Sequence, residues 1–138
     1  VRQVGATPVC GIDTSGYAVL NSAFIITSQK INLLLLLGLI NSNVLKFYWS
    51  QKFEDKRKTF PKIKGTYLEL LPIVKRIDLD FSSLVQDIVE YSAKGIDNTF
   101  KIRHLNLLIY HLYKLTYDEV LIVDPATHIT REEYEQKL

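Results

Sequence analysis

Two stretches near the start of the chain, 8–12 and 17–27, are rich in β-branched and aromatic residues, a composition that favours strands. The polar turn between them begins with Asp13 and ends with Gly16, as a type I turn does. This pattern predicts a β-hairpin. A second apolar stretch within 62–74 contains a proline that donates no ladder hydrogen bond, and it predicts an edge strand of the same sheet.

From Asn32 onward the apolar residues recur every three or four positions, which is typical of a helix. Asn32 is a candidate N-cap, and the segment 31–49 is apolar nearly all round. Such a helix is buried on most of its circumference. The residues of this helix that we expect in the core are Leu36, Leu37, Ile40, Val44 and Phe47.

Amphipathic helices are predicted at 81–94 and 98–115, with Gly95 suited to the left-handed position after the first helix. Two such helices with a short connection hide their apolar stripes best against each other. A capping-box pattern at 116–119 predicts a further short helix that ends near Pro125. The predicted fold class is α+β: a small, mostly antiparallel sheet with a buried Leu-rich helix, then a C-terminal antiparallel helical hairpin.

A length of 138 residues with 47% hydrophobic content suits one folded domain. The most apolar run, 31–40, is shorter than the about 20 residues that a membrane-spanning helix needs, so no membrane partner is expected. The single Cys10 forms no internal disulfide, which is compatible with the cytoplasm. Because the chain starts at Val1 and contains no Met, we expect a fragment of a longer protein.

Charge is distributed unevenly along the chain. Residues 118–138 hold six acids against two bases, whereas the segment 52–64 holds six bases against two acids. The basic part is the one expected to meet partners. We divide the chain into an N-terminal part at 1–76, a helical part at 77–123 and a polar acidic tail at 124–138.

Residues that could carry catalysis are sparse. Cys10 has no base near it in sequence, and a small buried thiol at a strand position is the commoner case. His104 and His111 are seven residues apart on one helix, whereas metal ligands on one helix favour a spacing of three or four. Nucleotide-binding and hydrolase signatures are missing. We therefore expect no catalytic residue, bound cofactor or metal in this chain.

Four aromatic residues are candidates for stacking on nucleic-acid bases. Aromatic side chains at helical or alternating spacing belong more often to a core, so both interpretations stay open. The four residues are Tyr17, Tyr48, Trp49 and Tyr67.

Two segments, 36–48 (LLGLINSNVLKFY) and 60–73 (FPKIKGTYLELLPI), resemble the TaqI-like C-terminal specificity domain of restriction–modification enzymes. The opening residues 1–5 (VRQVG) and 16–21 (GYAVLN) are similar to the first elements of that family, and 105–121 (LNLLIYHLYKLTYDEVL) is similar to its closing element. Their common order makes a chance match improbable.

The resemblance implies a domain that follows an adenine-N6 methyltransferase domain, often with a fused nuclease, in a prokaryotic cytoplasm, and that reads the DNA sequence to be methylated or cut. Cofactors of that parent are S-adenosyl-L-methionine and, as a further candidate, Mg²⁺. The methyltransferase motifs themselves do not occur here. This chain departs from the family at Asn106, where Asp is common, and at Lys114, where the family has Gly.

The resemblance implies that 1–76 is the DNA target-recognition part of the chain and that 77–123 is its helical hairpin and spacer. With this resemblance, the basic segment 52–64 becomes the candidate contact with double-stranded DNA. Arg57 has the fork geometry that grips guanine O6 and N7, and Arg2 and Gln3 are weaker candidates near the hairpin. The residues expected to contact phosphates are Lys52, Lys56, Lys58, Lys62 and Lys64.

Two other functions compete with DNA recognition. The helical hairpin could be a protein–protein assembly surface with no DNA contact, and a weaker third hypothesis is a thiol enzyme built on Cys10. DNA binding weakens steeply with added salt, whereas an apolar helical interface changes little. A thiol enzyme requires a lowered thiol pKa.

Overall fold

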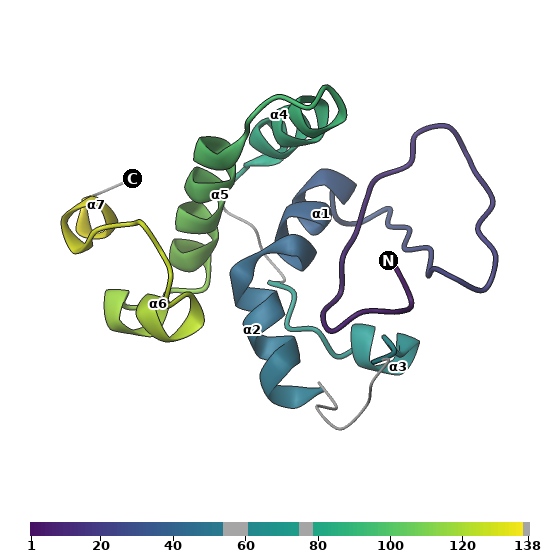
Figure 1. The fold of residues 1–138 in the computed structure, drawn as a ribbon, viewed down its shortest axis with the longest axis horizontal. Coiled ribbons are helices and arrows are strands. Elements are labelled where there is room, and N and C mark those ends of the chain that lie inside the picture. The colour runs from purple at the N-terminus through teal and green to yellow at the C-terminus, as the bar shows by residue number, and fades with distance from the viewer. Residues whose placement is uncertain (54–60, 75–78, 137–138) are drawn as a thin grey trace.

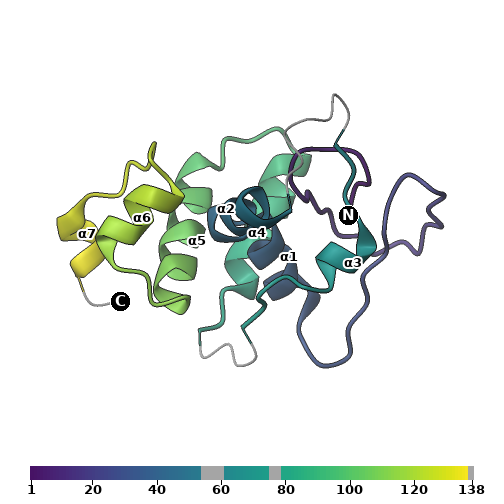
Figure 2. The same ribbon diagram turned by 90° about the horizontal axis from the view of Figure 1, so that it is seen from below.

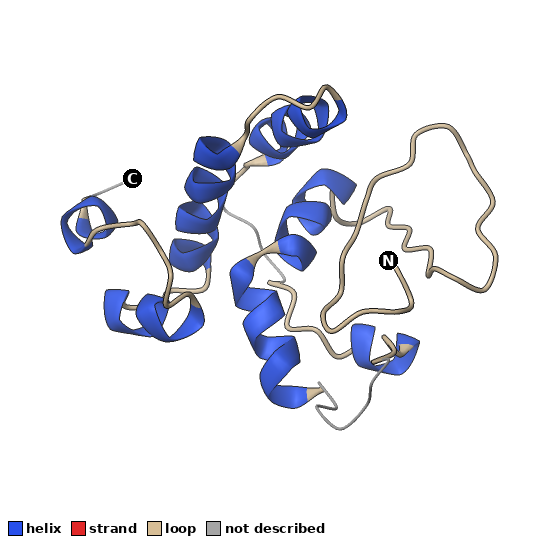
Figure 3. Ribbon diagram, in the orientation of Figure 1, coloured by secondary structure: helices blue, strands red, loops and turns tan. Residues whose placement is uncertain are grey.

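The computed structural model describes residues 1–53, 61–74 and 79–136. Within these residues the regular elements are helices, and Figure 3 shows no strand. The predicted α+β class with a sheet is therefore wrong. The helices are α1 (Leu33–Asn41), α2 (Asn43–Lys52), α3 (Gly65–Leu68), α4 (Ser82–Ala93), α5 (Thr99–Leu112), α6 (Tyr117–Val123) and α7 (Arg131–Glu135).

Strand-like residues in the N-terminal region pair at only two isolated antiparallel bridges, Arg2 with Ala23 and Val4 with Lys62. The predicted hairpin arms do not form a ladder, because residues 11–31 arch away from the body of the molecule (Figure 1). A cavity of about 460 Å³ separates this loop from α1. β-propensity measures the fit to a pleated, half-buried surface, and such a surface is missing where the loop stays exposed.

The Leu-rich segment forms two helices rather than one, and they meet at a bend of 58°. Ser42 causes the break, because its hydroxyl donates to the Leu39 carbonyl at 2.6 Å and accepts from the Leu45 N–H at 3.3 Å. It thereby ends α1 and caps α2. No single helix of the described residues is long and apolar enough to cross a membrane, and by length and composition only the bent pair reaches that threshold.

Burial of the Leu-rich segment follows the prediction in part. Leu37, Ile40 and Val44 are buried as predicted, whereas Leu36 and Phe47 are only partly buried.

The helix α4 packs on both α1 and α5, and α5 also packs on α2. The contact of α4 with α1 is close at Gly38, where a Cβ atom would lie 2.8 Å from Val85 Cγ2 and 3.1 Å from Phe81 Cε2. Val85 belongs to α4, and Phe81 is its N-cap. The predicted packing of the two C-terminal amphipathic helices on each other is therefore present, and the close contact of α4 with α1 is an addition that the sequence did not predict.

The C-terminal region adds two short helices to the core. Thr116 and Glu119 form the predicted capping box at the start of α6. Ile129 and Tyr134 are buried, and the Tyr134 hydroxyl donates to the Leu115 carbonyl at 2.5 Å. The segment 124–138, expected to be a polar acidic tail, thus contributes two side chains to the core. The boundary between the helical part and this segment at 124 stays a prediction.

Figures 1 and 2 agree on the arrangement along the long axis of the molecule. The N-terminal segment, the loop 11–31 and α3 lie at one end, and α6 and α7 lie at the other. The helices α1, α2, α4 and α5 form the body between these ends.

Candidate nucleic-acid interface

Residues 1–5 lie between two segments that are distant in sequence, 22–24 on one side and 61–63 on the other. The Ile63 N–H donates to the Gln3 carbonyl at 2.7 Å. The Gln3 N–H donates to the Ser22 backbone carbonyl, on the opposite side, at 2.9 Å. The chain's first residues therefore join the segments 22–24 and 61–63 into one unit.

The unit exposes three basic side chains. Val4 pairs with Lys62, and Arg2 pairs with Ala23 on the other flank of residues 1–5. The side chains of Arg2, Val4, Lys62 and Lys64 are all exposed. Ile63, between the two lysines, is 3% exposed and anchors the unit in the core. We call the surface formed by these four exposed residues, Arg2, Val4, Lys62 and Lys64, the basic face.

Neighbouring groups restrain two of the cations on the basic face. The Arg2 guanidinium lies against Gly5, where a Cβ atom would come within 3.0 Å of Nη2, so the missing side chain leaves room for it. The Lys64 ammonium lies over the ring of Tyr67, 5.3 Å from its centroid. Such a cation–π contact holds the charge in place without neutralising it.

Three of the four candidate stacking aromatics have structural roles. Trp49 is 2% exposed, and its ring meets that of Phe53 edge-on at 5.2 Å. Phe53 stacks on Tyr67 at 4.7 Å, and Tyr48 packs against Phe53 edge-on at 5.9 Å. This cluster joins the end of α2 to α3. Tyr17 differs from these three, because its side chain is 76% exposed.

The structure brings together Arg2, Gln3, Lys62 and Lys64 from the predicted contact residues, although Gln3 is half-buried and joins the unit by its backbone. Lys52 is exposed at the last position of α2, next to the aromatic cluster. The remaining three candidates, Lys56, Arg57 and Lys58, lie outside the described residues. All eight stay predictions as DNA contacts.

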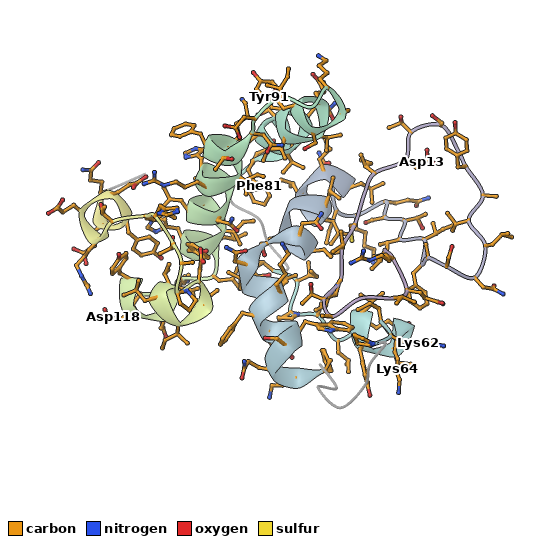
Figure 4. All side chains as sticks on the ribbon, in the orientation of Figure 1. Asp13, Lys62, Lys64, Phe81, Tyr91 and Asp118 are labelled. Atoms are coloured by element: carbon orange, nitrogen blue, oxygen red, sulfur yellow. The ribbon has the colours of Figure 1, made fainter. Side chains whose placement is uncertain are left out.

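Six of the chain's fifteen acidic residues lie within 118–138, at the far end of the molecule from the basic face. Figure 4 shows Asp118 at the end opposite Lys62 and Lys64. At this acidic end Arg131 pairs with Asp118, and Arg103 pairs with Glu133. The molecule therefore carries a charge gradient along its long axis, with its basic end at α3 and the N-terminal segment.

Geometry around Cys10 argues against an activated thiol. The side chain of Asn41 accepts from the Cys10 N–H at 3.0 Å and donates to its carbonyl at 3.1 Å, which ties the loop to α1. Burial raises the pKa of the Cys10 thiol, the opposite of what a thiolate nucleophile needs. Among the residues described here, no three His, Cys, Asp or Glu side chains come close enough to hold a metal ion.

Sequence reasoning missed the pairing that creates the basic face. The alternation Lys62-Ile63-Lys64 carried a signal, since one buried residue between two charged ones predicts two exposed cations on the same side. The partner segment 1–5 was not predictable, because nothing local specifies a contact across about sixty intervening residues.

Comparison with known families adds the decisive observation. The family model of the TaqI-like C-terminal specificity domain matches residues 1–73, a little more than half of the chain. The chain belongs to this family. The match confirms the resemblance drawn from the motifs, and it covers the basic face, the loop 11–31 and α1 to α3.

A specificity domain of this family gives a restriction–modification system its DNA sequence specificity, and it is a non-catalytic part. The resemblance of 105–121 lies outside the matched range. No curated protein and no solved structure matches the chain.

Proposed function

We propose that this specificity domain binds double-stranded DNA with its basic face and directs methylation or cleavage that other domains of the same protein carry out. The observation that carries the proposal is that Arg2, Lys62 and Lys64 are exposed on two segments that the Val4–Lys62 bridge holds together, within the range that matches the family. Like charges set side by side repel each other, and an anionic ligand such as a phosphate backbone removes that cost.

The charge gradient supports one orientation of the DNA. Phosphates are attracted to the basic end and repelled by the acidic α6 and α7, so the duplex docks on the N-terminal segment and α3. In this orientation Lys62 and Lys64 contact phosphates and set the register. The base-reading residues come from the same end of the molecule, and Arg57 remains the candidate for a guanine.

The parent protein, in this proposal, is a prokaryotic restriction–modification enzyme that acts in the cytoplasm. An adenine-N6 methyltransferase domain of the same chain supplies the chemistry with S-adenosyl-L-methionine, and an attached nuclease uses Mg²⁺. Burial raises the pKa of the Cys10 thiol, and methyltransferase motifs do not occur in this sequence; both support catalysis by other domains.

Binding measured against salt concentration tests the proposal. A cognate duplex is first selected with the full-length protein from a pool of random-sequence duplexes. The variants Lys62→Ala and Lys64→Ala should each lower the magnitude of the salt slope by about 0.9, as expected for one lost phosphate contact. Lys94→Ala is the matched control, because Lys94 is an exposed lysine at the end of α4 and away from the basic face.

The competing assembly function predicts a different result. If both lysine variants keep the parent's salt slope on cognate and unrelated duplexes, the basic face does not contact DNA. The proposed mode of binding is then wrong.

A further inference from the structure

The loop between Gly11 and Asn21 exposes large apolar side chains. Leu20 is 86% exposed and Tyr17 is 76% exposed. Between residues 11 and 29 the only charged side chain is Asp13. An exposed apolar loop of this kind marks an interaction site, and its lack of cations makes it unsuited to phosphates.

Two turns hold these side chains in a defined position. The carboxylate of Asp13 accepts from the Ser15 N–H at 2.9 Å and from the Tyr17 N–H at 2.8 Å. The Leu20 carbonyl accepts from the Ser22 N–H at 2.7 Å. Because the backbone is already ordered, little conformational entropy remains to be lost when the loop binds a partner.

The loop continues directly into the basic face. Its returning arm carries Ala23, which bridges to Arg2, and the next residue, Phe24, lies against Gly65 at the start of α3. A Cβ atom at Gly65 would be 3.4 Å from Phe24 Cε1. Figures 1 and 2 show the loop and α3 at the same end of the molecule. The returning arm of the loop therefore adjoins the basic face, and the rest of the loop extends from it at the same end of the molecule.

We propose that Tyr17 and Leu20 form an apolar wedge that inserts between base steps of the DNA bound to the basic face. This inference rests on the proposed function. Base pairs offer flat apolar surfaces between two charged backbones, so an uncharged aromatic and aliphatic pair fits the stack while the lysines hold the phosphates. Insertion unstacks a base step and bends the duplex by roughly 20–90°.

The test uses the full-length protein and the selected cognate duplex. Bending is measured by energy transfer between two dyes placed at the ends of the same duplex. Tyr17→Ser and Leu20→Ser should each weaken binding by about 5- to 140-fold, reduce the bend and leave the salt slope unchanged. Tyr17→Phe should keep both affinity and bend. Phe100→Ser is the matched control, since Phe100 is 77% exposed on α5, outside the matched range. Unchanged melting temperatures show that the exposed substitutions leave the fold intact.

The outcomes separate the wedge from the proposed function. If Tyr17→Ser and Leu20→Ser bind and bend the duplex as the parent does while the lysine variants lower the salt slope, the wedge is wrong and DNA binding on the basic face stands. If the lysine variants also have no effect, both fail. The wedge is also overturned if Phe100→Ser weakens DNA binding as much as Tyr17→Ser does. It is overturned likewise if sedimentation shows that the weaker binding of Tyr17→Ser or Leu20→Ser comes from altered self-association of the protein.

Discussion

Gly38→Ala tests the closest packing in the fold. Gly38 lies in α1 at the point where α4 and α5 approach, and an added Cβ would be 2.8 Å from Val85 Cγ2. Carbon atoms in favourable contact are about 3.5–4.0 Å apart, so one of the groups must move. Val85 is 3% exposed, and a valine in a helix has one strongly preferred rotamer, which limits its escape.

Two opposing effects set the size of the change. Replacing a helical Gly by Ala stabilises a helix by about 1 kcal/mol. Overpacking a tight core costs about 1–3 kcal/mol, and the contacts to Val85 and Phe81 together place this site in the upper half of that range. The free energy of unfolding should therefore fall by about 1–2 kcal/mol.

Urea unfolding of Gly38→Ala, Val85→Ala and the double variant measures this effect as a cycle. In the Val85→Ala background the obstructing methyl groups are gone, so Gly38→Ala should be neutral or stabilising there. Gly11→Ala, with open space within 4 Å, is the control and should change stability by less than about 0.5 kcal/mol. A Gly38→Ala variant more stable than the parent would refute the close approach of α1 and α4.

Three further results are expected. Lys114 has a φ of 56°, a left-handed conformation that a glycine adopts without steric cost. Lys114→Gly should therefore raise the free energy of unfolding, measured in urea, by about 1 kcal/mol. Lys94→Gly is the control and should not, because Lys94 has a φ of −90°. Burial lowers the pKa of the His111 imidazole below its ordinary value of about 6.5. The contribution of neutral His111 to the free energy of unfolding should therefore be fully present above that pH and decline as the pH falls below it. Thermal melts of His111→Gln should show a weaker decline over the same pH range. Because burial raises the pKa of Cys10, alkylation at neutral pH should be slow in the native protein and rapid in denaturant, and equally rapid native alkylation would contradict this environment.

Local signals in the sequence predicted several helix ends, although not the break at Ser42. Asn32 accepts from the Leu34 N–H at 2.8 Å as the N-cap of α1, and Gly95 takes a φ of +66° after α4. Lys114 takes the left-handed conformation, with a φ of 56°, at the position where the sequence resemblance expects Gly. Such features depend on a few neighbouring residues, so they can be read from one sequence.

Features that depend on distant partners were predicted poorly. The stretch 17–27 has strand composition, yet whether it joins a sheet depends on a partner that the sequence does not specify locally. The packing of α4 on α5 was predicted from two neighbouring amphipathic stretches, whereas the close contact of α4 with α1 at Gly38 was not. The candidate site shows the same division, since Lys62 and Lys64 were predicted as contact residues and the Val4–Lys62 pairing that brings the segment 1–5 to them was not.

Hydrogen exchange of the full-length protein, with and without the selected cognate duplex, tests the central claim most directly. The account predicts that DNA slows exchange in residues 1–5, 13–24 and 61–67 and leaves α6 and α7 unchanged. Slower exchange confined to α4 to α7, or no change in the N-terminal segments at saturating DNA, would contradict DNA recognition by the basic face.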